Sequence, residues 1–156
     1  MRHFFGLLLG VVVTAAVLLG AGWASQEVIR GAALNLDPSR DWRMLTAIGV
    51  MALVGLLVAL VLVTRVSPLA AFVPSLVLLA WTVVYVLDVT RATGLAPTGS
   101  SVQAEVAEAG RGMLALLSTG ILGMLGVALF VPVLMPSRWA GPVRDDEDEY
   151  EENVGY

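Results

Sequence analysis

The chain has 156 residues, of which 58% are hydrophobic and 14% are charged, a composition that excludes an ordinary soluble domain. It contains no cysteine and one histidine, which excludes disulfides, thiolate metal sites and bis-histidine haem ligation. The net charge of −4 comes from the C-terminal end, because seven of the thirteen acidic residues lie within residues 145–152.

Four apolar blocks contain no Asp, Glu, Lys, Arg or His. Each is close to the roughly 20 residues that a helix needs to cross a hydrocarbon core, and none alternates as a barrel strand does. We therefore predict an all-α polytopic membrane protein with four transmembrane helices in an up-down-up-down bundle. Residues 1–136 form this domain, residues 137–156 form a disordered acidic tail, and the spans cover residues 4–23, 44–64, 69–87 and 113–135.

The first block has two interpretations, a retained span or a signal peptide. Arg2 and His3 precede it, and Gly22-Trp23-Ala24 resembles a cleavage site. The apolar run exceeds the roughly 7–15 residues of a removable signal, which favours retention. Cleavage would leave three spans.

The connections between the blocks differ in length. We expect a first loop at residues 24–42, in which Asp37 and Pro38 begin the next helix. A tight turn at residues 65–68 joins the second and third spans. A second long loop starts near Asp88, and Ser100 with Gln103 resembles a capping box that opens a further helix, with Gly110 and Gly112 marking a joint.

Four spans place both termini on one side of the membrane. Arginines are almost equally divided between the two sides, so the positive-inside rule decides little. We predict cytoplasmic termini, because Arg2 and the free amine adjoin the first span and both long loops then lie outside. All nine basic residues are Arg, a bias typical of GC-rich bacteria that favours a bacterial plasma membrane. Three tryptophans at block ends fit an interfacial belt: Trp23, Trp42 and Trp139.

Polar side chains share one face of the third span, namely Ser75, Thr82, Tyr85 and Asp88. Pro74 lies beside this stripe and frees the carbonyl of Ala70, as a proline within a helix does. The stripe has two interpretations, the wall of a solute cavity or a set of hydrogen bonds to neighbouring helices. The second is favoured, because such hydroxyls commonly bond across helix contacts in membranes.

Small residues recur at intervals suited to close helix packing. Gly55 precedes Ala59 by four residues, and Thr119 precedes Gly123 by four. The candidate packing positions are Gly6, Gly10, Gly55, Gly120, Gly123 and Gly126.

The functional prediction rests on the absence of recognisable catalytic and binding motifs. No catalytic triad, phosphate-binding loop, cofactor motif or metal-ligand cluster is present, and no ionisable group lies within the four blocks for proton-coupled transport. We predict a non-enzymatic accessory or scaffold subunit that acts through helix packing, its outer loops and its acidic tail. Expected partners are the bilayer, other membrane proteins or itself, and a basic partner for the tail, with no nucleic acid, cofactor or metal. The alternative is a small oligomeric channel or transporter for a neutral or lipophilic solute, built around the polar stripe.

Overall fold

The computed structural model describes residues 2–63, 68–99 and 102–134, and these contain helices and no strand. Three helices are long and apolar enough to cross a membrane, and a bent helix pair makes a fourth span if it is counted as one. This result confirms the predicted all-α membrane fold. The elements are α1 (Arg2–Ala15), the π-helix η1 (Ala16–Ala21), α2 (Gly22–Ala33), α3 (Trp42–Val63), α4 (Pro68–Leu87), α5 (Val89–Leu95), α6 (Ala104–Ser118), α7 (Ile121–Phe130) and the 3₁₀ turn η2 (Val131–Leu134).

The first span is longer than expected. α1, η1 and α2 form one apolar helix from Phe4 to Ala33, whereas the sequence pattern predicted a loop from Ala24. Thirty residues rise about 45 Å as a helix, compared with a hydrocarbon core of about 30 Å. The last turns of α2 therefore extend to the edge of the core or beyond it, and they carry charged residues there.

Backbone hydrogen bonds end α2, and a side-chain cap begins α3. Asn35 adopts φ 51°, the amide of Leu36 donates to the carbonyl of Gly31, and the amide of Asn35 donates to that of Ala32, which is the Schellman arrangement. Asp41, rather than the expected Asp37, caps α3 by accepting a 2.9 Å hydrogen bond from the amide of Met44.

Asp37 lies within the connecting loop instead. It accepts hydrogen bonds from the hydroxyl and the amide of Ser39, and these bonds lower the pKa of the Asp37 carboxyl.

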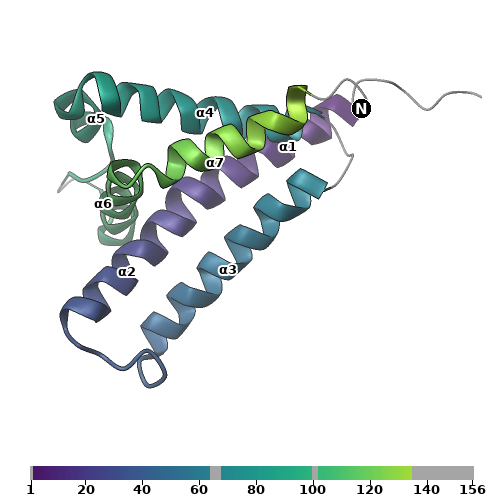
Figure 1. Cartoon of the computed structure of the whole chain (residues 1–156). Coiled ribbons are helices and arrows are strands. Elements are labelled where there is room, and N and C mark those ends of the chain that lie inside the picture. The colour runs from purple at the N-terminus through teal and green to yellow at the C-terminus, as the bar shows by residue number, and fades with distance from the viewer. Residues whose placement is uncertain (1, 64–67, 100–101, 135–156) are drawn as a thin grey trace, which may run out of the picture.

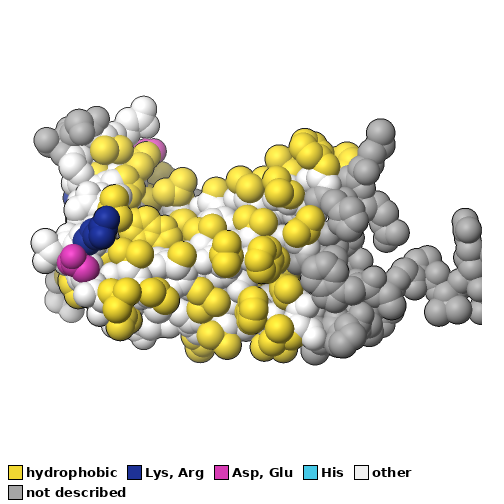
Figure 2. All heavy atoms as spheres, turned by 90° about the horizontal axis from the view of Figure 1, so that it is seen from above, with side chains coloured by type: hydrophobic (Ala, Val, Ile, Leu, Met, Phe, Trp, Pro, Cys, Tyr) yellow, Lys and Arg dark blue, Asp and Glu magenta, His cyan; other side chains and the backbone are white. Residues whose placement is uncertain are grey.

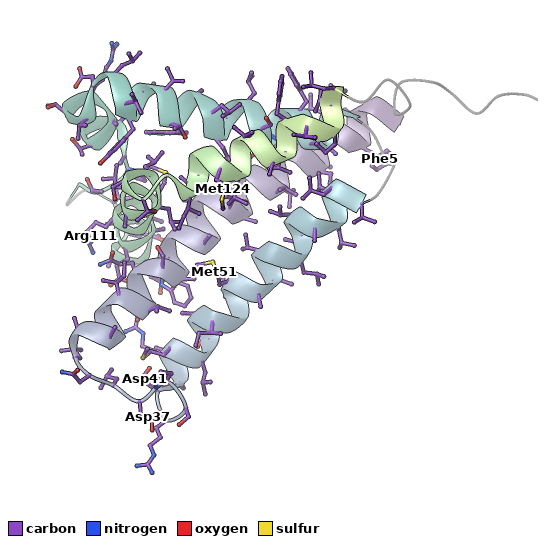
Figure 3. The ribbon with its side chains drawn as sticks, in the orientation of Figure 1. Phe5, Asp37, Asp41, Met51, Arg111 and Met124 are labelled. Atoms are coloured by element: carbon purple, nitrogen blue, oxygen red, sulfur yellow. The ribbon has the colours of Figure 1, made fainter. Side chains whose placement is uncertain are left out.

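The long helices run between two ends of the molecule (Figure 1). The start of α1, the end of α3, the start of α4 and the end of α7 lie at one end, and α5, α6 and the loop after α2 lie at the other. Hydrophobic side chains spread along the body in Figure 2, whereas acidic and basic side chains gather at the second end. Phe5 marks the first end, and Asp37 and Asp41 mark the second (Figure 3).

The expected span at residues 113–135 is divided between two helices. α6 and the segment from α7 to η2 meet at an angle of 77°. The joint is at Gly120, which has φ 77°, and not at Gly110 or Gly112 as expected. Only a residue without Cβ takes this conformation at no steric cost. The fourteen residues from 121 to 134 rise about 21 Å as a helix, which is shorter than the core.

α6 crosses α2 with their backbones in direct contact. A Cβ atom on Gly112 would overlap the carbonyl oxygen of Gly22, and one on Gly22 would lie 2.5 Å from the carbonyl oxygen of Ala109. The hydroxyl of Ser25 donates to Gly22 at 2.9 Å and lies 3.4 Å from the carbonyl oxygen of Gly112. Small residues thus let α6 approach α2 as closely as two helices can.

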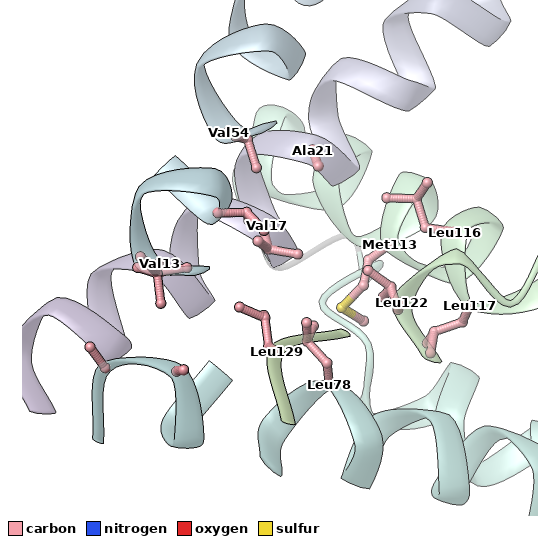
Figure 4. Close-up of a cluster of buried hydrophobic side chains, with 14 of the residues drawn as sticks. Val13, Val17, Ala21, Val54, Leu78, Met113, Leu116, Leu117, Leu122 and Leu129 are labelled. Carbon is pink, nitrogen blue, oxygen red and sulfur yellow. The ribbon is translucent and has the colours of Figure 1, made fainter. Parts of the chain in front are cut away.

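The buried core joins the long first helix to the returning segments (Figure 4). Val13 and Val17 of the first helix, Leu78 of α4 and Leu129 of α7 are each at most 1% exposed. α6 adds Met113 and two leucines to the same cluster. α3 contributes Val54, Val58 and Val61 along one face only, and its other faces are exposed.

The contact between α2 and α6 predicts a large effect of adding one methyl group. Gly112→Ala should lower the free energy of unfolding in detergent by about 3 kcal/mol, because two backbones must separate. Gly55→Ala is the matched control, since a Cβ there meets no atom within 4 Å and alanine favours a helix by up to about 1 kcal/mol. Thermal unfolding of both variants checks this. Equal stability of the two variants would contradict the direct backbone contact between α2 and α6.

Candidate functional site

A carboxylate is buried between two arginines near the end of α2. Glu27 is 1% exposed. Its Oε2 accepts hydrogen bonds from Nε and Nη2 of Arg30 at 3.0 and 2.6 Å, and its Oε1 lies 2.8 Å from Nη2 of Arg43. Arg43 comes from the first turn of α3, so this ion pair joins two helices. A buried charge requires such partners, since an unpaired carboxylate is costly to bury.

The two oxygens of Glu27 are not equally satisfied. Oε2 accepts the two hydrogen bonds of Arg30, whereas Oε1 is close to Arg43 but accepts no hydrogen bond of good geometry from the described residues. The attraction to Arg43 is therefore mainly that of opposite charges. The Arg43 side chain stays 43% exposed, so the ion pair does not enclose it.

The sequence pattern did not predict this cluster of Glu27, Arg30 and Arg43, which is called the triad below. Residues 24–33 were assigned to a loop, in which Glu27 would be solvated. The spacing of Glu27 and Arg30, three residues apart, is the signal that could have indicated a continued helix. The partner on α3 had no signal, because Arg43 lies sixteen positions after Glu27 in the sequence.

A cavity of about 450 Å³ opens beside the triad. Arg43 and Thr46 of α3 line one side, Glu105 of α6 lines another, and two indole rings, those of Trp23 and Trp42, also border it. Trp42 begins α3 and Trp23 lies in the first turn of α2, and indole rings favour the membrane interface. The cavity thus combines a cation, a carboxylate and aromatic surface at the charged end of the molecule.

A second hollow lies between α3 and α7 and has a different character. Its volume is about 350 Å³, and aliphatic and methionine side chains with Gly55 make up its lining, without any charged residue. Met51, Gly55 and Ala59 of α3 face Ile121 and Leu125 of α7 across it. This hollow is called the α3–α7 groove below.

The predicted polar stripe lies on α4, and its members make different contacts. The hydroxyl of Ser75 is fully buried and donates to the carbonyl of Gly126 in α7 at 2.9 Å. Thr82 donates to Leu78 within α4. Tyr85 is half-buried, and Asp88 is exposed and caps α5 by accepting from the amide of Arg91.

The predicted packing glycines have different surroundings. Gly10, Gly123 and Gly126 contact α4, since Cβ atoms there would meet Val73, Thr82 and Leu79 at 2.9 to 3.0 Å. Gly6 is buried. Gly55 and Gly120 have open space beside them, so Gly120 serves the bend between α6 and α7 and Gly55 leaves room in the α3–α7 groove.

The described residues hold no group of three or more His, Cys, Asp or Glu side chains that could bind a metal ion. The predicted acidic tail and Trp139 lie outside the described residues. Comparisons with protein-family models, with curated proteins and with solved structures found no match for this chain.

The buried triad predicts that its carboxylate stabilises the fold. Glu27→Ala should lower the free energy of unfolding by about 2 kcal/mol, because it removes the buried carboxylate that both arginines bind and leaves its volume empty. Arg40→Ala is the control, since its pair with Asp37 spans 3.7 Å in an exposed loop and such pairs contribute less than about 1 kcal/mol. Glu27→Gln removes the charge and keeps the side-chain volume, so it separates the contributions of these two properties to the free energy of unfolding. Thermal unfolding in detergent checks the order, and a Glu27→Ala variant as stable as Arg40→Ala would contradict it.

Proposed function

We propose that this protein is a non-enzymatic accessory or scaffold subunit of a membrane complex, which binds a transmembrane helix of another protein in the α3–α7 groove. The observation that carries this proposal is the groove itself. It is open, it lies within apolar spans, and no charged side chain lines it.

The dimensions of the groove suit a helix. Its α3 wall runs from Met51 (Figure 3) to Leu62, eleven residues or about 16 Å along the axis. Gly55 and Ala59 are the smallest residues of its α3 wall, and a Cβ on Gly55 would meet nothing within 4 Å. Because lipid tails give helices no hydrophobic reason to associate, close backbone approach over small residues is a main source of affinity in membranes.

The lining also bears on the alternative function. A path for a neutral polar solute, one form of that alternative, needs polar groups or a water-filled cavity along the membrane interior, and the α3–α7 groove offers neither. The polar stripe of α4 gives a channel or transporter no support, since Ser75 and Thr82 donate their hydroxyl hydrogens within the protein.

The proposed setting is the bacterial plasma membrane with both termini in the cytoplasm. The start of α1 and the end of α7 lie at the same end of the molecule (Figure 1), which agrees with an even number of crossings. Arg2, just before the first span, favours the cytoplasm for that end. The acidic residues 145–152 would then be available to a basic cytoplasmic partner.

Single cysteines test the groove, because the natural chain has none. Gly55→Cys carrying a maleimide-linked photocrosslinker should form an adduct with another membrane protein in native membranes. Leu53→Cys is the matched control, since two residues rotate the side chain by roughly 200° to the opposite side of α3. Mass spectrometry of the adducts identifies the partner. Equal yields from both positions, or none from either, would overturn the proposed docking site.

The orientation has its own test. Arg40→Cys places a thiol in the exposed loop between α2 and α3, which the proposal puts outside the cell. A membrane-impermeant maleimide should label this variant in intact cells. A cysteine added after Tyr156 should be labelled only after lysis. The reverse pattern would invert the proposed topology.

A further inference from the structure

The cavity beside the triad continues into an apolar groove along α3. Trp42 and Thr46 line both the cavity and a hollow of about 520 Å³ that extends over Gly49 to Leu53. This hollow is almost entirely apolar, and a Cβ on Gly49 would meet no atom within 4 Å. It lies on the side of α3 opposite the α3–α7 groove, since Leu53 and Gly55 point roughly 200° apart.

The length of this combined site matches one leaflet of a bilayer. From Trp42 to Leu53 the helix rises about 16 Å, and half of a hydrocarbon core is about 15 Å. Trp23 and Trp42 mark the end of the site that belongs at the interface. The charged cavity therefore lies at headgroup level, and the apolar groove runs from there toward the middle of the membrane.

The charges of the cavity select the class of headgroup. Arg43 forms one ion pair, with Glu27, and 43% of its side chain stays exposed. Glu105 is exposed, and none of the ion pairs among residues 2–63, 68–99 and 102–134 involves it. The cavity wall thus offers one cation and one carboxylate that are not paired with each other.

We propose that this combined site binds one zwitterionic glycerophospholipid. Its phosphate contacts the guanidinium of Arg43, its ammonium contacts the carboxylate of Glu105, and one acyl chain lies over Gly49 in the groove. A planar guanidinium suits phosphate oxygens, and the indole rings of Trp23 and Trp42 favour an adjacent ammonium. This inference does not depend on the docking of a partner helix, because the two grooves lie on opposite sides of α3.

Native mass spectrometry of the purified full chain tests the proposal, with phosphatidylethanolamine and phosphatidylglycerol as probes. The wild type should retain phosphatidylethanolamine in preference to phosphatidylglycerol. Gly49→Leu fills the groove and should reduce this retention about tenfold, the effect of roughly 1.4 kcal/mol. Gly55→Leu adds the same volume to the other side of α3 and should leave it unchanged.

A charge reversal separates headgroup recognition from general lipid adhesion. Glu105→Arg should reverse the preference toward phosphatidylglycerol, because the wall then carries two cations. Glu105 is exposed, so this change does not disturb the core. A wild type that retains phosphatidylglycerol as well as or better than phosphatidylethanolamine would overturn the proposal, and so would equal losses in Gly49→Leu and Gly55→Leu or an unchanged preference in Glu105→Arg.

Discussion

The backbones of α2 and α6 touch where Gly22 meets Gly112, and the rest of the structure follows from this crossing. No side chain fits between them, so α6 is held across the long first helix at the charged end of the molecule. The chain must then turn at Gly120 to return along α4 as α7. The same crossing brings Glu105 to the cavity beside Arg43. One contact without side chains therefore positions both the bend and one wall of the candidate lipid site.

The carboxylate near the membrane edge is neutralised by ion pairs and not by contact with water. Glu27 is buried at the end of a helix longer than the hydrocarbon core, and two arginines from different elements neutralise it. Removing Arg43 would leave one oxygen of the buried carboxylate unpaired where solvation is poor, which is why the triad fastens α3 to the first helix. The remaining donors of Arg43 are then free to meet a ligand outside the triad.

α3 separates two surfaces with different preferences. It packs against the first helix through valines on one face, and it presents open glycines on each side. The side that includes Gly49 leads to charged and aromatic groups, whereas the side that includes Gly55 has only apolar neighbours. A phospholipid has both kinds of group, and a transmembrane helix within the bilayer has an apolar surface. The chemistry of each groove thus agrees with the occupant proposed for it.

The sequence alone determined the helical membrane character, because long runs without charge can satisfy their backbone groups inside lipid only as helices. It also indicated that Asp88 lies at a helix end. Two features were decided by tertiary structure. Glu27 is buried within a continued helix, where Arg43, distant in sequence, adds a second counterion to that of Arg30. Gly112 and Gly120 look alike in sequence, yet one permits a backbone contact and the other a left-handed bend. Which role each glycine takes depends on where α2 lies, and no local pattern contains that information.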